Sequence, residues 1–382
     1  MANSKSIIIA PIRILHVTGL NLGGSETTLM NYYRHIDRTK IQFDFLITKK
    51  GSEKHHYEDE AISFGANIYT RPPRTRHLIR NTLALFRAIR KNTDIEVVHI
   101  YDRYAMRPTI DAFVAKLAGI KVRIIYSSNN MDSVRSFTHS FFRPFARLFA
   151  THHTACSKEA GISMFGKSSK NKIIVIPRAR DLSSFKFDPI RREKMRILLG
   201  LQGAKVCIMV ARLASQKNHL FILEAFASVV SNIASNTSNV VLLLVGDGPE
   251  REAVESKIDV MQLDKHVRVL GARTDIPDLL QVADMLLFPS VYEGFGAVAI
   301  EAQASGLPCL LSDTIPRATK VTDLVTFLPI NKGPHIWVDA ILATMGHTRE
   351  DTLEQVMQAG NDVYTATKWL TDFYSQAISQ RR

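Results

Sequence analysis

The first half of the chain alternates short apolar runs with longer segments whose apolar residues recur every three or four positions. Short apolar runs predict buried strands, and the longer spacing predicts helices that pack one face on a sheet. The predicted strands are Ile12–Val17, Phe43–Ile47, Val97–Ile100, Val122–Tyr126 and Lys172–Ile176. The predicted helices include Ser25–Ile36, Leu78–Lys91 and Thr109–Ala118. This order indicates an α/β fold with a parallel sheet.

The second half begins the same pattern again. Its predicted strands are Val206–Val210, Val240–Val245, Val267–Leu270 and Met285–Phe288, and its predicted helices are Asn218–Ser231, Glu250–Met261 and Ile276–Val282. Between the halves, residues 181–196 interrupt the alternation with Asp188-Pro189 and a run of charges. We therefore predict two doubly wound, Rossmann-like domains, 1–185 and 186–360, and a C-terminal helix over 361–382 that packs back on the first domain. Two such domains facing each other form a cleft for a ligand at the carboxyl ends of their strands.

Charge is distributed unevenly between these halves. Residues 1–195 contain 33 lysines and arginines against 16 acidic residues, whereas residues 196–382 contain 16 against 20. A basic half indicates an anionic partner, and no nucleic-acid recognition motif accompanies it. The three cysteines are too widely separated for a metal site or a disulfide framework, and no apolar run approaches the length of a signal peptide core or a membrane span. We expect a cytoplasmic protein.

An aromatic stripe lies in the basic half, between Arg135 and Phe149. Helical spacing would gather its phenylalanines on one face with arginines at the borders. Two interpretations fit this pattern, namely a helix that packs on the core and a helix that lies on an anionic membrane surface. The phenylalanines are Phe137, Phe141, Phe142, Phe145 and Phe149.

Three loops that follow predicted strands carry residues suited to a phosphorylated ligand. Gly23-Gly24 precedes a helix, where paired glycines let the backbone approach a ligand and free N–H groups attract an anion, although a purely structural turn has the same sequence. Arg212 and Lys217 follow Val206–Val210 and could clamp a diphosphate without a metal, or could be solvated surface cations.

The third loop is the most specific. Glu293 follows a strand, Gly294-Phe295-Gly296 turns the chain, and Glu301 lies eight positions after Glu293 in the next predicted helix. One carboxylate could hold a sugar hydroxyl and the other a ribose diol, with phosphate between them at the start of the helix. The sequence therefore predicts a nucleotide-sugar site.

These motifs resemble glycosyltransferase family 4, a family of retaining enzymes with the two-domain GT-B fold. The paired glutamates are its hallmark, and Gly246-Asp247-Gly248-Pro249-Glu250 also matches. The resemblance extends from about Ile12 to Ala343. Within the family, Glu301–Cys309 and Ser312–Ile315 look like the bacterial exopolysaccharide and capsule branch.

The resemblance implies a role for each motif. The first domain would take the acceptor and the second the nucleotide sugar, with UDP as the expected nucleotide and without a metal. Arg212 and Lys217 would hold the donor diphosphate, Glu301 the ribose, and Glu293 with the Gly294-Phe295-Gly296 backbone the transferred sugar. Gly23 and Gly24 would border the phosphate from the first domain, and Gly271 and Arg273 would lie near the base. The acceptor implied is a polyprenyl-linked or other oligosaccharide at the inner face of the plasma membrane, which the basic first domain would contact.

Four positions depart from the family pattern. Tyr101 stands where the branch often has the second histidine of a His-x-His motif that begins at His99, and Tyr126 lies where histidines are common. Arg178 replaces an asparagine near the domain boundary, and Ala318 replaces a common glutamate. Because these positions lie mostly on the acceptor side, we interpret them as a changed acceptor, with His99, Tyr101 and Tyr126 as candidate sugar contacts. Two alternatives remain, a non-catalytic partner of another transferase and a nucleotide-sugar epimerase on the same fold.

Overall fold

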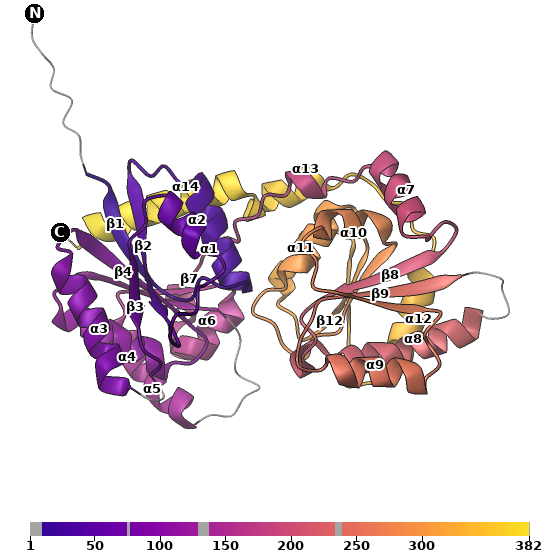
Figure 1. The fold of residues 1–382 in the computed structure, drawn as a ribbon, viewed down its shortest axis with the longest axis horizontal. Coiled ribbons are helices and arrows are strands. Elements are labelled where there is room, and N and C mark those ends of the chain that lie inside the picture. Colours follow the sequence, from indigo (N-terminus) through magenta and orange to yellow (C-terminus); the bar gives the residue numbers. More distant parts are fainter. Residues whose placement is uncertain (1–9, 75–76, 129–136, 234–238, 382) are drawn as a thin grey trace, which may run out of the picture. The chain divides into compact units, whose positions relative to one another are not determined.

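The computed structural model describes residues 10–74, 77–128, 137–233 and 239–381 (Figure 1). Arg135, at the start of the aromatic stripe, lies outside these ranges. The chain divides into two compact units, the first made of Met1–Arg180 and Val363–Arg382 and the second of Asp181–Asp362. Each unit is an α/β domain with one parallel sheet, as the sequence predicted.

The first unit contains a seven-stranded sheet in the order β3-β2-β1-β4-β5-β6-β7. All neighbouring strands pair in parallel. The strands are β1 (Ile12–Val17), β2 (Ile41–Thr48), β3 (Ile68–Arg71), β4 (Ile95–Asp102), β5 (Val122–Ser127), β6 (His152–Ala155) and β7 (Ile173–Val175). The strand order reverses between β1 and β4, so the loops that follow these two strands diverge and leave a crevice at the carboxyl edge of the sheet.

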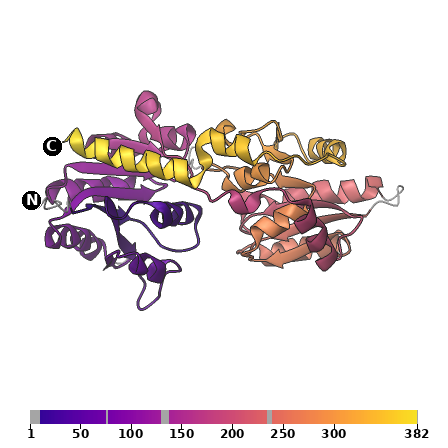
Figure 2. The same ribbon diagram turned by 90° about the horizontal axis from the view of Figure 1, so that it is seen from above.

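Helices cover both faces of this first sheet. α3 (Leu78–Lys91), α4 (Met106–Leu117), α5 (Phe137–Phe149) and α6 (Lys158–Phe165) pack side by side (Figure 1). The C-terminal helix α14 (Val363–Ser379) packs against α1 (Gly24–His35), and Figure 2 shows its length along the first unit. The short helix α2 (Glu58–Ser63) lies between β2 and β3 in the chain.

The second unit contains a six-stranded parallel sheet in the order β10-β9-β8-β11-β12-β13. Its strands are β8 (Lys205–Val210), β9 (Val240–Val245), β10 (Val267–Gly271), β11 (Met285–Phe288), β12 (Cys309–Ser312) and β13 (Val325–Leu328). Its helices are α7 (Pro189–Leu198), α8 (His219–Ile233), α9 (Arg251–Val260), α10 (Ile276–Val282), α11 (Ala297–Ala304), α12 (His335–Thr344) and α13 (Leu353–Val356).

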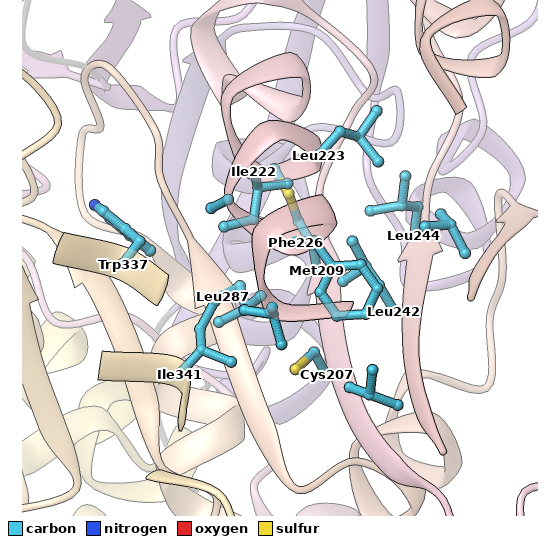
Figure 3. Packing of buried hydrophobic residues seen from close by; sticks show 14 of the residues in the cluster. Cys207, Met209, Ile222, Leu223, Phe226, Leu242, Leu244, Leu287, Trp337 and Ile341 are labelled. Carbon is cyan, nitrogen blue, oxygen red and sulfur yellow. The ribbon is translucent and has the colours of Figure 1, made fainter. Parts of the chain in front are cut away.

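The core of the second unit explains why its strands are apolar throughout. All six residues of β9 are buried, because helices cover both faces of the sheet. On one face, Ile222, Phe226 and Val229 place a helical stripe of α8 on the sheet, and Figure 3 shows Phe226 beside Met209 and Leu242. Trp337 of α12 is fully buried in the same cluster and donates a hydrogen bond from Nε1 to the Pro329 carbonyl, at 3.2 Å.

Two further features of the described residues concern the cysteines and the apolar length of the helices. The three cysteines, Cys156, Cys207 and Cys309, are buried free thiols. None of the helices that the structure describes is both long enough and apolar enough to cross a bilayer.

Candidate active site

The second unit has its own point of strand reversal, where β8 lies between β9 and β11. The loops that follow β8 and β11 diverge there, and their residues include Arg212, Lys217 and the segment from Pro289 to Gly296. Polar side chains that follow adjacent parallel strands meet at the same edge of the sheet. The polar residues of the candidate site in the second unit therefore lie on these two loops.

Hydrogen bonds hold the two loops together. Gln216 donates from Nε2 to the Tyr292 carbonyl at 2.8 Å, and the Val291 N–H donates to the Gln216 carbonyl at 2.8 Å. Asn218, in the left-handed conformation with φ 63°, ends the short 3₁₀ turn and leads into α8. These bonds place the Lys217 ammonium opposite the loop that carries Glu293.

Lys217 and Glu293 form an ion pair between Nζ and Oε1. Their side chains are only 19% and 10% exposed, so the pair is shielded from solvent screening. The Lys217 ammonium also lies 5.1 Å from the centre of the Phe288 ring. A cation and a carboxylate in contact at a strand end can bind neighbouring parts of one polar ligand, the cation a phosphate oxygen and the carboxylate a hydroxyl.

The start of α11 adjoins this ion pair. Gly296 precedes the helix with φ 87° and ψ 56°, and a Cβ there would lie 3.1 Å from the Phe288 ring, so a glycine is favoured on both counts. The Phe295 carbonyl accepts a hydrogen bond from the Thr319 hydroxyl, in the 3₁₀ turn that also contains the exposed Ala318. Glu301 lies in α11 and is 9% exposed.

The glycines after β9 allow its loop to touch the loop after β8. A Cβ on Gly246 would lie 2.0 Å from the Ala211 carbonyl oxygen, and one on Gly248 would lie 2.3 Å from the Leu213 carbonyl oxygen. Next along the sheet, the Gly246 N–H donates to the Gly271 carbonyl at 2.8 Å. The loops after β8, β9 and β10 therefore form a continuous rim.

Two arginines stand on this rim. Arg273 makes a two-pronged ion pair with Asp275, at 2.8 Å from Nε and 2.6 Å from Nη2, and its side chain is 42% exposed. Arg212 is exposed and makes no ion pair with any other described residue. Its guanidinium is thus available to an anionic ligand.

The first unit holds the Gly23-Gly24 turn at the start of α1. Arg178, which is 7% exposed, donates from Nη1 to the Gly24 carbonyl at 3.2 Å and to the Thr28 hydroxyl at 3.4 Å. The segment around Arg178 is tied to α1 again by Asn31, which donates to the Ala179 carbonyl at 2.9 Å. The arginine that departs from the family pattern therefore braces the glycine turn.

The tyrosines and the histidine named as sugar contacts form a buried cluster. His99 is fully buried, and its Nδ1 lies 2.7 Å from the Tyr374 hydroxyl and 3.2 Å from the Tyr101 hydroxyl. Burial lowers the pKa of His99 well below its usual range. Tyr126 is only 4% exposed, whereas Tyr101 borders a pocket described below. Tyr101 therefore lies both in this buried cluster and at the border of that pocket.

Sequence reasoning missed Tyr374, which joins the cluster from α14, 275 residues after His99. No local pattern distinguishes it from the other apolar positions of that helix. In the described part of the chain, no group of three or more His, Cys, Asp or Glu side chains could hold a metal ion.

Two family models match the sequence. The one described as Glycosyltransferase Family 4 matches residues 22–184, and the one described as Glycosyl transferases group 1 matches residues 191–342. Together they span both units.

Individual proteins resemble the chain over most of its length. The putative glycosyltransferase EpsF of Bacillus subtilis (strain 168) is 30% identical over 95% of this chain and 96% of its own length. The Escherichia coli UDP-Gal:alpha-D-GlcNAc-diphosphoundecaprenol alpha-1,3-galactosyltransferase is 25% identical over 79% of each protein. The crystal structure of Anabaena Alr3699/HepE with UDP and glucose superposes with a TM-score of 0.76, at 19% identity over 96% of this chain and 100% of that one. This likeness shows that the fold is of the GT-B type.

Proposed function

Because the chain belongs to glycosyltransferase family 4, we propose that it transfers a hexose from a UDP-sugar to a hydroxyl of a lipid-linked or oligosaccharide acceptor, with retention of configuration. The pathway is exopolysaccharide or capsule synthesis. The observation that carries the proposal is the shielded contact of Lys217 with Glu293 beside the start of α11. The relative from Escherichia coli supports the substrates, since its name states a UDP-sugar donor and a diphosphoundecaprenol-linked acceptor.

Stabilisation of the leaving group supplies most of the proposed catalysis. The bond between the anomeric carbon and the diphosphate breaks, and negative charge grows on the departing phosphate. Arg212, Lys217 and the backbone N–H groups where α11 begins offer positive charge to that phosphate without a metal. Removal of one such donor typically costs a factor of about 100 to 1,000 in kcat.

The carboxylates orient the donor in this proposal. Glu293 binds a hydroxyl of the transferred sugar, Glu301 binds the ribose, and Gly271 and Arg273 border the base. No side chain is assigned as a covalent nucleophile. The acceptor oxygen bonds to the anomeric carbon, and its proton passes to the departing phosphate oxygen, which keeps the configuration when attack and departure share one face of the sugar.

A membrane contact in the first unit would bring the enzyme to its lipid-linked acceptor. α3, α4 and α5 pack side by side and contain eight lysines and arginines but one acidic residue, Asp111, which is buried. They also carry nine of the 19 large apolar side chains that are exposed in the described residues. These nine form what we call the apolar face, and they are Leu78, Ile79, Leu83, Phe113, Leu117, Phe137, Phe141, Phe145 and Leu148.

The chemistry of the apolar face favours a lipid surface. Helices that carry exposed apolar side chains and cations but no exposed acidic residue match an anionic bilayer, where the apolar side chains insert at the level of the headgroups and the cations meet phosphates. Phe141 and Phe145 are turned to solvent at 54% and 39%, so α5 exposes part of its aromatic stripe. The proposal therefore includes a cytoplasmic enzyme that binds peripherally to the inner face of the plasma membrane.

Thermal unfolding with nucleotides tests the donor site. We expect UDP or a UDP-sugar to raise the melting temperature without metal, since a ligand at about 100 times its Kd adds roughly 2.7 kcal/mol of stability. GDP and ADP with their sugars serve as comparisons, each with and without Mg²⁺. If no nucleotide shifts the transition, the proposed donor site is wrong, and a non-catalytic partner becomes the better account. Release of UDP from the matching sugar by the purified chain separates a transferase from that partner.

A further inference from the structure

A pocket of about 620 Å³ opens within the first unit, at the carboxyl ends of β1, β2, β3 and β4. This volume lies in the range of sites for small ligands. Tyr101 and Asp102 border it from the end of β4, and Thr18 and Gly19 border it from the end of β1. The pocket thus occupies the reversal point of the first sheet.

Four cations border the pocket, Lys50, Arg71, Arg74 and Arg107. Arg71 and Arg74 share a single carboxylate, that of Asp111, at 3.0 Å and 2.5 Å. The two arginine side chains are 13% and 10% exposed, and that of Asp111 is 2% exposed. Because one carboxylate neutralises one guanidinium, this buried trio keeps a net positive charge beside the pocket.

The other two cations have no such partner. Among the described residues, neither Lys50 nor Arg107 forms an ion pair, and the Arg107 side chain is exposed. Arg107 attracts the Asp102 carboxylate without forming an ion pair with it, and Asp102 Oδ1 accepts the N–H groups of Arg103 and Tyr104, at 2.7 and 3.1 Å. Burial raises the pKa of the Asp102 carboxyl.

Glu53 is the remaining acidic residue of the lining, and it is exposed. His55 also borders the pocket, and its Nδ1 accepts the Leu20 N–H at 3.1 Å. The lining therefore carries four cations and two carboxylates, and Asp111, which is not part of the lining, is committed to two of the cations. A pocket that bound only neutral sugar hydroxyls would gain nothing from this excess charge.

We propose that this pocket binds an anionic group of the acceptor, with Lys50 and Arg107 as its direct ligands and the Arg71–Asp111–Arg74 trio as the support that sets its charge. That the bound anion belongs to the acceptor rests on the proposed function, whereas the presence of an anion site does not. Two sources carry suitable chemistry, the diphosphate of a lipid carrier and the carboxylate of an acidic sugar. Arginine and lysine bind both through charge-assisted hydrogen bonds.

Binding of two probes to the full chain tests the site. Isothermal titration with pyrophosphate and with glucuronate is carried out on the wild type and on Lys50→Gln and Arg107→Gln. We expect each substitution to weaken binding of the preferred probe on the order of tenfold, since each removes a charged hydrogen-bond donor. Arg107→Lys should recover part of the loss. Arg103→Gln is the matched control, because Arg103 is an exposed neighbour that stacks on Tyr104 and does not line the pocket.

Each outcome decides the matter. Preference for pyrophosphate assigns a phosphate ligand, and preference for glucuronate assigns an acidic sugar. Binding that is equal in the wild type and both Gln variants overturns the site, because pyrophosphate held by the second unit alone would behave in that way. If the protein binds UDP but the wild type and both Gln variants bind the probes equally, only the anion site is contradicted. If probe binding depends on Lys50 but no nucleotide raises the melting temperature, the anion site stands and the proposed donor site is contradicted.

Discussion

The two units share a parallel α/β architecture but differ in charge and surface. The first unit contains 32 lysines and arginines against 14 acidic residues, and the second contains 17 against 22. The first also exposes the apolar face, whereas exposed apolar residues in the second are scattered over α7, α8, α9 and the loop after β11. The same sheet architecture thus occurs in an acidic unit and in a basic unit that exposes the apolar face.

The units also differ in how they hold their loops. In the second, backbone contacts such as Gly246 against the Ala211 carbonyl combine with side-chain bonds between neighbouring loops, as from Gln216 to the Tyr292 carbonyl. In the first, side chains join segments that lie further apart in the sequence, as where Arg178 braces Gly24 and Tyr374 reaches His99. We therefore expect substitutions in the second unit to affect donor chemistry, and substitutions on the first to affect partners and stability.

The largest effect is expected at the Lys217–Glu293 pair. Lys217→Ala should lower kcat by a factor of about 100 to 1,000 in a folded protein, because it removes one cation from the departing phosphate. Glu293→Gln should lower it comparably by weakening the hold on the sugar. Release of UDP under single-turnover conditions measures both.

A second lysine–glutamate pair provides the control. Lys257 and Glu224 lie 2.8 Å apart in the same unit, at 32% and 46% exposure, away from the loops after β8 and β11. Lys257→Ala should leave turnover unchanged. Full activity in Lys217→Ala would contradict the assigned role of that lysine.

The sequence could predict the features that leave a local signature. Motifs whose backbone needs a glycine, such as those at Gly246 and Gly296, leave a local signature, and the paired glutamates have a fixed spacing. The α/β class and the strands predicted in both halves are confirmed. The buried network of His99, Tyr101 and Tyr374 joins segments that are distant in the sequence, so no local sequence pattern predicts these contacts.

Short strands were missed for a related reason. β3 and β6 have four residues each, and β6 begins with two histidines that interrupt any apolar run. Their places in the sheet come from pairing with β2 and β5, which the chain segment itself does not encode. For the aromatic stripe, spacing alone left two interpretations, a helix that packs on the core and a helix on a membrane surface. α5 packs on α4 and α6 while Phe137 is 84% exposed, so the helix has both a packed and an exposed part.

A second prediction tests the difference in exposed apolar surface between the two units. Replacing Phe137, Phe141 and Leu148 together by serine should weaken binding to vesicles that contain anionic lipid on the order of 100-fold, because each apolar side chain that inserts contributes roughly 1 kcal/mol or more. Co-sedimentation at low salt measures this binding. Added salt should weaken the binding of the wild type, because the flanking cations contribute about 1 kcal/mol each near an anionic surface.

The second unit again offers the control. Ile190, Leu198 and Val260 are exposed to a similar degree, at 81%, 73% and 77%, but lie outside the apolar face. Serine at these three positions should leave vesicle binding unchanged. Equal binding by both triple variants would show that the apolar face is not the membrane contact.

The smallest effect concerns acid stability, which should also differ between the units. His16 is fully buried on β1, and neither ring nitrogen has a hydrogen-bond partner among the described residues. Burial lowers the pKa of His16 to about 3, so the unfolded chain takes up a proton below about pH 6.5 that the folded unit refuses. The contribution of His16 to the free energy of unfolding is therefore fully present above about pH 6.5 and is lost as the pH falls toward 3.

His99 should act in the same direction within the first unit. Among the described residues of the second unit, the comparable group is His219, whose pKa is lowered to about 4 by burial and by Lys217. His16→Leu should therefore flatten the pH dependence of the first unit's unfolding by about 1.4 kcal/mol per pH unit between pH 6 and 4. Calorimetry at several pH values measures the slope, with His56→Leu as the exposed control. An unchanged slope in His16→Leu would mean that the folded unit accommodates the imidazolium, and that the first unit owes its acid sensitivity to other groups.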